Sequence, residues 1–256
     1  MIGRVAALGY GIASYLVFFL SLLYAMAFIG NYLLPSSIDV GAEDGLARSI
    51  LIDLVLLGLF AVQHSVMARP AFKRWWTTIV PASCERSTYV LISSLLLLLI
   101  FWQWRPVVTT IWRVEGWTAT LLTAIYWFGW LTALTSSYMI DHFELFGLRQ
   151  VFAALRGAAV RVQGFKTPLL YRLVRHPIML GFLLAFWAAP HMTLGHLLFA
   201  VMTTLYILIG VTLEERDLVA QFGARYEQYR QRVPMLLPRL RGGRSRASSP
   251  DEPLQI

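Results

Sequence analysis

The residues best suited to chemistry gather in one stretch near the C-terminus, residues 171–229. Its first polar cluster contains Arg-His-Pro at residues 175–177, and its last contains Glu-Glu at 214–215. The segment between them is apolar and is interrupted by Pro-His-Met at 190–192. A break there predicts a helical hairpin whose two polar ends lie side by side.

The two ends differ in charge. Pro177 suits the first position of a helix, where its missing N–H costs nothing, and His176 would then be the cap. The free N–H groups of that turn, with Arg175 beside them, suit an anion such as a carboxylate. At the other end, Glu214 and Glu215 are expected to end the returning helix, where they could hold an ammonium group or pair with Arg175. A ligand with both a carboxylate and an amino group fits this pair of ends.

The elements that must position these residues are membrane helices. Hydrophobic residues make up 57% of the 256-residue chain, too many for a soluble domain of this size. Apolar windows cover residues 8–29, 50–67, 89–104, 117–140, 178–189 and 194–213. A crossing helix needs about 20 residues, so the fifth window predicts a half-length helix. We expect an all-α integral membrane protein, a bundle of five to six transmembrane helices with a C-terminal helical hairpin.

Loop charges predict how the bundle is oriented. Residues 30–49 are acidic, whereas residues 69–88 and 141–177 are basic. Because basic loops remain in the cytoplasm, we expect both termini and the polar site on that side. The net charge of +8 is explained in the same way. It indicates contact with membrane lipid and gives no reason to expect nucleic acid.

One domain accounts for nearly the whole chain. Residues 1–238 are expected to form a single transmembrane domain, and residues 239–256, rich in Arg, Gly, Ser and Pro, a disordered basic tail. The single cysteine, Cys84, excludes an internal disulfide. The five histidines lack metal-ligand spacing, so no metal site is expected, and no protein partner is evident.

Three runs in the C-terminal stretch resemble a known motif. They are Leu-Val-Arg-His-Pro-Ile-Met-Leu-Gly at 173–181, Glu-Glu-Arg-Asp-Leu at 214–218 and Phe-Gly-x-x-Tyr-x-x-Tyr at 222–229. Together they resemble the C-terminal motif of the isoprenylcysteine carboxyl methyltransferase-like membrane methyltransferases. The position after His-Pro-x is often Tyr in that family and is Met179 here.

The rest of the chain narrows the resemblance. Residues 63–70, 141–150 and 187–193 are similar to the bacterial methanethiol S-methyltransferases, and the similarity extends over about residues 10–238. It implies S-adenosylmethionine as methyl donor, a small volatile thiol as substrate, dimethyl sulfide as product, and the bacterial inner membrane as location. The implied cofactor-binding residues are Tyr171, Val174, Arg175, His176, Pro177, Gly181, Glu214, Glu215 and Tyr226.

Several of these residues also have a purely structural interpretation. Arg175 could form an ion pair with one of the two glutamates and touch no ligand. His176 could act only as a helix cap, and Gly181 could serve close helix approach. Tyr226 could pack its helix beneath the cofactor instead of contacting it.

Methyl transfer to a thiol also needs a base or a cation, because a free thiol has a pKa above 7. Four residues are expected to take catalytic roles, His64, His142, Asp141 and Arg175. The first three lie at predicted cytoplasmic ends of spans, level with the Arg-His-Pro turn. Our hypothesis is that His64 or His142 accepts the thiol proton. Hydrogen bonds to loop carbonyls would explain both histidines equally well.

Two other functions stay open on the sequence alone. The first is the same chemistry on another lipophilic acceptor, such as an isoprenylcysteine carboxylate, which needs a groove open to lipid. A methanethiol site should instead be small and closed by bulky residues such as Phe143, Phe146 or Trp187. The second is a non-enzymatic, haem-binding membrane protein. The Gln-His-Ser run at 63–65 and the Arg-His-Pro turn also resemble the NnrU proteins, which generally lack the end at 214–229.

Overall fold

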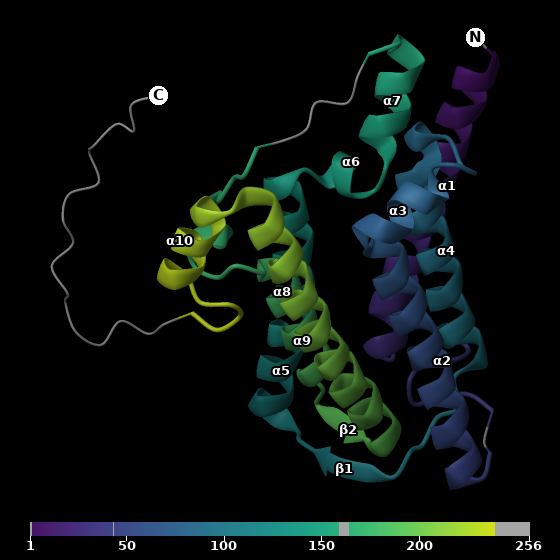
Figure 1. Ribbon diagram of the computed structural model, residues 1–256. Coiled ribbons are helices and arrows are strands. Elements are labelled where there is room, and N and C mark those ends of the chain that lie inside the picture. Colours follow the sequence, from purple (N-terminus) through teal and green to yellow (C-terminus); the bar gives the residue numbers. More distant parts are fainter. Residues whose placement is uncertain (1, 43, 159–163, 239–256) are drawn as a thin grey trace, which may run out of the picture.

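The computed structural model describes residues 2–42, 44–158 and 164–238, and the chain is mostly helical (Figure 1). Four helices are long and apolar enough to cross a membrane, by length and composition: α1 (Ile2–Ile29), α2 (Leu46–Ala68), α4 (Ala82–Gln103) and α9 (Leu194–Phe222). Even the shortest has 22 residues, about 33 Å at 1.5 Å per residue. The prediction of a mostly helical chain with several membrane-length apolar helices is confirmed.

Two further helices match the remaining predicted windows. Helix α5 (Gly116–Ile140) has 25 residues, many of them Trp, Tyr, Thr and Ser, and is not one of these four candidate spans. Helix α8 (Pro177–Trp187) has 11 residues, about half the length of a crossing helix, as predicted. A Cβ atom on Gly129 would lie 2.6 Å from the carbonyl oxygen of Gly181. The two glycines therefore let α5 and α8 pack backbone to backbone, as expected.

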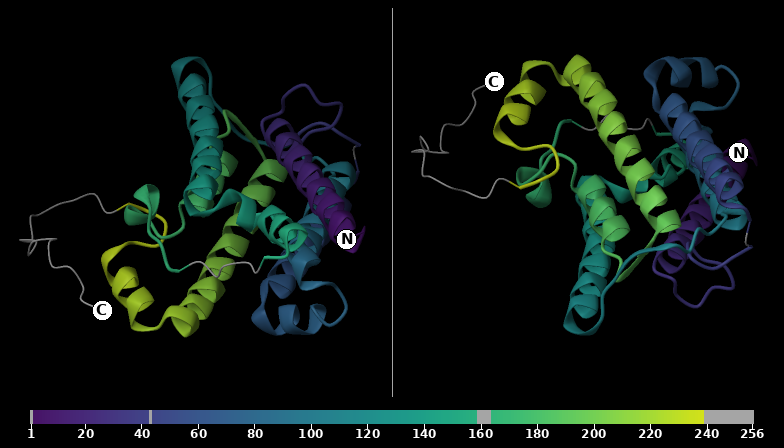
Figure 2. Two further views of the ribbon diagram at one scale, coloured as in Figure 1. Left: turned by 90° about the horizontal axis from the view of Figure 1, so that it is seen from above. Right: turned by 90° about the horizontal axis from the view of Figure 1, so that it is seen from below.

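The helices form two groups that meet near one end (Figures 1 and 2). The N-terminal group consists of α1, α2 and α4, with the short helices α3 (Pro70–Trp76) and α7 (Leu148–Arg156) beside them. The C-terminal group consists of α5, α8, α9 and α10 (Ala224–Arg232). Helix α9 also contacts α2 and so links the groups.

The apolar core lies at the end where the groups meet. It includes Phe28, Ile100 and Trp104 from the N-terminal group, and Trp130 and Phe199 from the C-terminal group. They come from the last turns of α1 and α4, from the residue directly after α4, from α5 and from the first turns of α9. Burial of these aromatic side chains joins the groups at this end.

A small sheet closes the same end, which we call the sheet end. Strand β1 (Thr110–Arg113) pairs antiparallel with β2 (His191–Thr193), with Thr110 opposite Thr193 and Arg113 opposite His191. The sequence predicted only a loop and a helix break here. The break after α8 is confirmed, but its backbone is paired with β1, and the indole N–H of Trp112 donates to the carbonyl of Ala189 at 3.0 Å.

The opposite end, which we call the cavity end, is built from short elements. Besides α3, α7 and α10 it contains α6 (His142–Leu145) and the 3-10 helix η1 (Leu169–Arg172). Gly147, with a φ of +87°, begins α7, and a Cβ atom there would lie 2.6 Å from Oγ of Ser87. Glycine thus lets the α6–α7 turn pack directly on α4. The predicted tail at 239–256 lies outside the described residues.

Candidate active site

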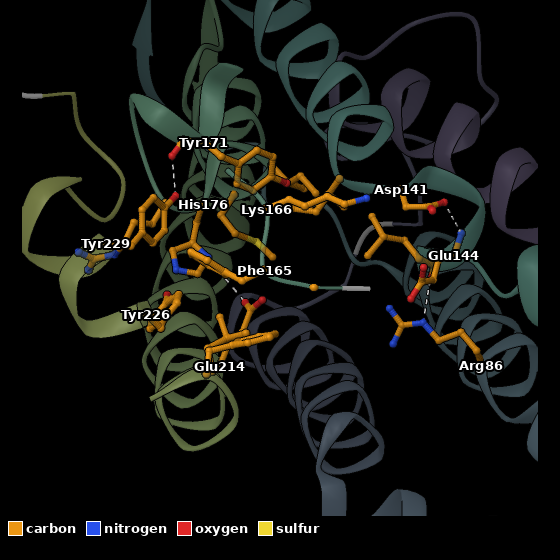
Figure 3. Close-up of a pocket in the computed structure, with 18 of the residues that line it drawn as sticks. Arg86, Asp141, Glu144, Phe165, Lys166, Tyr171, His176, Glu214, Tyr226 and Tyr229 are labelled. Atoms are coloured by element: carbon orange, nitrogen blue, oxygen red, sulfur yellow. Dashed lines mark hydrogen bonds and ion pairs between the residues drawn. The ribbon is translucent and has the colours of Figure 1, made fainter. Parts of the chain in front are cut away.

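A cavity of about 490 Å³ lies at the cavity end, between the two helical groups (Figure 3). We define its N-terminal wall as the charged residues of α3 and α4, Lys73, Glu85 and Arg86. Its C-terminal wall comprises Phe165, Tyr171, Arg175, His176, Glu214, Phe222, Tyr226 and Tyr229. The predicted convergence of the two polar ends of the hairpin is therefore observed.

The hairpin ends follow the predicted local structure in one case and depart from it in the other. Pro177 is at the start of α8 with His176 as its N-cap, as predicted. Glu214 and Glu215 do not end the returning helix, because α9 continues to Phe222. The prediction that the helix ends at the two glutamates is wrong, since the polar residues after them keep the helical hydrogen bonds.

Arg175 and Glu215 form a buried ion pair. The guanidinium Nε lies 2.7 Å from Oε1 of Glu215, and Nη2 lies 3.2 Å from Oε2. The remaining group, Nη1, donates to the carbonyls of Arg230 and Val233, both at 2.7 Å. Both charged side chains are less than a tenth exposed. Arg175 therefore holds α9 and the segment after α10 against the start of α8.

The same carboxylate orients His176. Oε1 of Glu215 lies 3.0 Å from Nε2 of the imidazole, and a carboxylate can only accept, so Nε2 carries the proton. In the neutral ring the lone pair is then on Nδ1, which lies 3.7 Å from Oε2 of Glu214. Glu214 lines the cavity and is about half exposed. Adjacent glutamates thus have different surroundings, one inside the protein and one in the cavity.

Aromatic rings surround one part of the C-terminal wall. The ring of Phe165 lies 5.5 Å from Phe222, 5.6 Å from Tyr226 and 5.2 Å from Tyr229, between ring centroids. The Tyr229 hydroxyl donates to the carbonyl of Tyr171 at 2.5 Å. Such rings suit a planar aromatic ligand, which would stack on or against them.

The hydroxyls of these tyrosines keep their protons, and that of Tyr226 is not used within the described part of the chain. Burial raises the pKa of Tyr229 to about 12, and it also raises the pKa values of Tyr171 and Tyr226. Tyr226 is 1% exposed, and its hydroxyl has no hydrogen-bond partner among the described residues. A buried unpaired hydroxyl that borders a cavity is what a polar ligand would satisfy.

The N-terminal wall was not predicted as part of the site. Nε of Arg86 donates to the carbonyl of Leu145 at 2.7 Å, and the guanidinium lies over the ring of Tyr89, 5.1 Å from its centroid. Burial lowers the pKa of Lys73, and the nearby charge of Arg86 lowers it further. The sequence offered only their basic charge beside a span, which we interpreted as an orientation signal.

Asp141 lines the cavity, as a catalytic candidate should, but it also has structural contacts. Its carboxylate caps α6 by accepting from the backbone N–H of Glu144 at 3.0 Å, and it pairs with Arg149. Arg149 also lies 3.2 Å from Glu144. Asp141 therefore fixes the turn between α5 and α6.

His142 faces away from the cavity, towards α1. Its Nδ1 is 2.8 Å from Oγ of Ser137, and its Nε2 is 2.9 Å from the hydroxyl of Tyr15. The ring also stacks on Tyr138 at 4.2 Å between centroids. Burial lowers the pKa of His142, which favours the neutral ring. These contacts join α1 to the end of α5.

His64 lies inside the N-terminal group and does not line the cavity. Its Nδ1 is 3.1 Å from Oγ of Ser93, and its Nε2 is 2.7 Å from the hydroxyl of Tyr89. The ring of Tyr89 in turn supports the guanidinium of Arg86. His64 is thus connected to the cavity indirectly, through Tyr89 and Arg86.

The cavity unites about half of the predicted cofactor-binding residues. Those that line it are Tyr171, Arg175, His176, Glu214 and Tyr226. Those that do not line it are Val174, Pro177, Gly181 and Glu215. Gly181 packs against α5, which agrees with its structural interpretation. Residues that the sequence missed are Lys73, Glu85, Arg86, Glu144, Phe165 and Lys166.

The three bulky residues expected to close a thiol site, Phe143, Phe146 and Trp187, do not line this cavity. Phe146 stacks on Phe18 at 3.8 Å between centroids, and Phe143 is half exposed. Trp187 is at the other end of α8, where it donates to Thr204. The apolar lining comes instead from Ile140, Leu145, Ile178, Met179 and Leu218.

Comparison with known proteins gives consistent results. The chain is 61% identical over 240 residues to "Methanethiol S-methyltransferase 2" of Bradyrhizobium diazoefficiens, covering 94% of this chain and 93% of that protein. It is 55% identical over 230 residues to "Methanethiol S-methyltransferase" of Mycobacterium tuberculosis, covering 90% of this chain and 94% of that protein. No solved structure matches the chain.

A family match covers most of the chain as well. Residues 52–237 match the family described as "NnrU protein". That region includes residues 214–229, so this end does not separate the chain from the NnrU proteins, contrary to our expectation. The two results are compatible, because both describe the same helices and the same cavity-lining segments. The chain belongs to the NnrU family and to the family of the methanethiol S-methyltransferases.

Proposed function

We propose that this protein methylates methanethiol, with S-adenosylmethionine as the methyl donor, to give dimethyl sulfide and S-adenosylhomocysteine. The observation that carries the proposal is 61% identity, over 94% of this chain, to a protein named for that activity. The transferase activity follows from the family, and the donor and the roles of individual residues are supported by the cavity.

The cavity fits the proposed cofactor in size and chemistry. Binding pockets for small ligands and cofactors typically measure about 300–1,000 Å³, and this one measures about 490 Å³. The unpaired hydroxyl of Tyr226 and the rings around Phe165 suit an adenine ring. The half-exposed carboxylate of Glu214 suits a positively charged group. When bound, S-adenosylmethionine supplies a methyl group activated by its sulfonium.

The protein must then position the two reactants and accept the proton of the thiol. Correct positioning alone can contribute about 7–11 kcal/mol to such a reaction. His176 is the histidine that lines the cavity, and its Nδ1 is the ring atom that is not committed to Glu215. In this proposal Nδ1 accepts the proton from the thiol S–H, and the proton leaves to water through Glu214.

His64 and His142 fit this role less well. Each has both ring nitrogens within 3.1 Å of a hydroxyl inside the protein, and neither lines the cavity. In our proposal they position Tyr89 and the α5–α6 turn, while Asp141 caps α6 and Arg175 holds α9. Replacing His176 by Asn should lower turnover far more than affinity for S-adenosylhomocysteine. If His64→Ala lowered turnover as much as His176→Asn does, His64 would instead be the better candidate for the base.

The small apolar lining supports methanethiol as the acceptor. Ile140, Ile178, Met179 and Leu218 come from three helices and border the charged part of the cavity. A thiol with one carbon needs only such a limited apolar surface. Replacing Met179 by Ala should let ethanethiol react relatively faster, and an unchanged preference would place the acceptor elsewhere.

We further propose six crossings, formed by the four long helices with α5 and the half-length α8, and a cytoplasmic cavity end. The basic segments that contain Arg74 and Arg149 support this orientation, as does the acidic loop with Asp39 and Asp44. In a Cys84→Ser background, a membrane-impermeant maleimide added to intact cells should label Arg113→Cys and spare Arg74→Cys. The reverse pattern would overturn the orientation.

The activity is tested with the purified protein. It is incubated with methanethiol and S-adenosylmethionine carrying a deuterated methyl group, and dimethyl sulfide is followed by headspace gas chromatography and mass spectrometry. Labelled product should form with the wild type and with Arg113→Gln, and drop at least about 100-fold with Glu214→Gln. Binding of S-adenosylhomocysteine without any product would remove methanethiol as the acceptor.

A further inference from the structure

A ligand with a carboxylate needs a cation, and among the described residues four cationic side chains line the cavity: Lys73, Arg86, Lys166 and Arg175. Arg175 is already committed, because Glu215 and two backbone carbonyls accept from its guanidinium. The backbone N–H groups of residues 175 and 176 also donate to carbonyls after α10, at 2.9 and 3.2 Å. The turn where the sequence suggested an anion site is therefore filled by the chain's own groups.

Arg86 has a different set of contacts. Its Nε donates to the carbonyl of Leu145, and its guanidinium rests on the ring of Tyr89. Among the described residues, no hydrogen bond or ion pair engages its two Nη groups. Figure 3 shows the guanidinium at one side of the cavity, with His176 and Glu214 across from it. Two contacts thus fix the side chain while two donor groups remain available.

The two lysines are less suited to a carboxylate. Lys166 points toward Asp141 (Figure 3). Lys73 lies near Glu85 and Asp217, and burial lowers the pKa of its amine. An arginine keeps its charge at every working pH and can donate two parallel hydrogen bonds to one carboxylate.

Neighbouring carboxylates do not neutralise Arg86. The nearest elements carry Glu144 and Asp141, and Arg149 pairs with both of them. The described residues contain no ion pair between Arg86 and any carboxylate within 4.0 Å. Its positive charge therefore faces the cavity without a carboxylate partner among the described residues.

We infer that Arg86 of the N-terminal wall binds the carboxylate of the cofactor, while the C-terminal wall binds its adenine. The inference rests on the proposed function, since it assumes a nucleoside ligand with an amino-acid end. One ligand would then bridge the two helical groups at the end where the apolar core does not join them. Arg86 is thus a binding residue, contributed by a helix outside the recognised motif.

The test compares two ligands that differ only in the carboxylate. Affinities of the full-length protein for S-adenosylhomocysteine and for its decarboxylated analogue are measured by isothermal titration calorimetry. The wild type should prefer the carboxylated ligand by about 10- to 100-fold, the range of charge-assisted hydrogen bonds. Arg86→Gln should reduce that preference to within about threefold and leave affinity for the analogue unchanged. Arg74→Gln, an exposed cation on α3, is the matched control and should keep the full preference.

Other results would overturn the inference. One is an Arg86→Gln protein that keeps the full preference for the carboxylated ligand. Another is loss of that preference in Lys73→Gln but not in Arg86→Gln. Arg86→Lys keeps a cation but cannot donate two parallel hydrogen bonds, so its preference for the carboxylated ligand should be intermediate. This variant serves as the test if Arg86→Gln does not fold. If the wild type binds both ligands equally, only the role of Arg86 is refuted. If the wild type binds neither ligand, the proposed function is refuted as well.

Discussion

The two walls of the cavity are held in place in different ways. The C-terminal wall is bonded within itself, with Arg175 and His176 sharing the buried carboxylate of Glu215. In the N-terminal wall, Arg86 is fixed by Leu145 and Tyr89, and its terminal donors remain available. The first wall is a self-contained unit that shapes the site, whereas the second supplies charge to it.

This difference predicts which changes damage the fold and which damage only binding. Removing a member of the buried network leaves an unpaired charge inside the protein, which is costly. Removing a cavity-facing group leaves the fold intact, because water can replace its contacts. The experiments below test that division, beginning with the largest expected effect.

The largest loss of stability is expected for Arg175→Ala. The change leaves Glu215 as a buried charge and frees the carbonyls of Arg230 and Val233, which should cost about 3–5 kcal/mol. The melting temperature in detergent should fall by about 10 °C or more. The matched control is Arg113→Ala, whose pair with Glu115 is exposed, with atoms 3.8 Å apart, and should change melting very little. If Arg175→Ala and Arg113→Ala lowered the melting temperature equally, the buried ion pair would not stabilise the C-terminal wall.

The adjacent glutamates give the next contrast. Glu214→Gln should lower the transfer rate by about 100-fold, equivalent to about 2.7 kcal/mol, with the melting temperature unchanged. Glu215→Gln should lower the melting temperature, because Arg175 then keeps its charge without a carboxylate. Both variants are compared by the dimethyl sulfide assay and by thermal melting. If Glu214→Gln melts early at full activity, the assignment of the two residues must be reversed.

The sequence predicted the C-terminal wall better than the N-terminal one for a physical reason. Pro177 and His176 lie next to each other, and their positions at the start of α8 follow from local helix rules. Arg175 and Glu215 are 40 positions apart, yet one helical hairpin brings them together. Their convergence therefore needed only the break after α8, which the sequence also contained.

The N-terminal wall required long-range packing that no local pattern encodes. Arg86 reaches the site because α7 packs against α4 and brings the end of α6 beside it, so that the Leu145 carbonyl accepts from its Nε. The paired strands β1 and β2 were missed for the same reason, since their pairing joins residues about 80 positions apart. His64 and His142 were placed at the correct ends of their helices. Which way their rings face depends on Tyr89 and Tyr15, and sequence spacing does not reveal it.

A smaller loss of stability is expected where α8 packs against α5. In Gly181→Ala the new methyl group would lie 2.6 Å from the backbone nitrogen of Ala133, so α8 must shift. Overpacking of this kind costs about 1–3 kcal/mol, which should lower the melting temperature by about 3–10 °C. Because α8 begins directly after Arg175 and His176 of the C-terminal wall, affinity for S-adenosylhomocysteine should fall as well.

Gly210→Ala is the matched control for that change. A Cβ atom at Gly210 meets nothing within 4 Å, so the substitution should leave melting unchanged or raise it slightly through better helix propensity. Unchanged melting and affinity in Gly181→Ala would show that the C-terminal wall does not depend on the α5–α8 contact.

The smallest expected effect is a pH dependence at His142, the contact between α1 and the end of α5. Burial lowers its pKa below the ordinary 6.5, although Asp141 opposes this, so below about pH 6.5 the unfolded chain binds more protons than the folded one. Stability should therefore fall as pH decreases through this range, by at most about 1.4 kcal/mol per pH unit. His142→Gln removes the titrating group, so its melting temperature should change less between pH 7.5 and 5.5 than that of the wild type.

The same variant separates a positioning role from catalysis. Both ring nitrogens of His142 are bonded to hydroxyls, of Ser137 and Tyr15, and the ring faces away from the cavity. His142→Gln should therefore keep measurable transfer at pH 7.5 and lose only part of its stability. If transfer stops while melting and cofactor affinity remain normal, His142 is the base after all. The catalytic proton would then leave through the contact with α1, and the C-terminal wall would no longer contain the whole reaction.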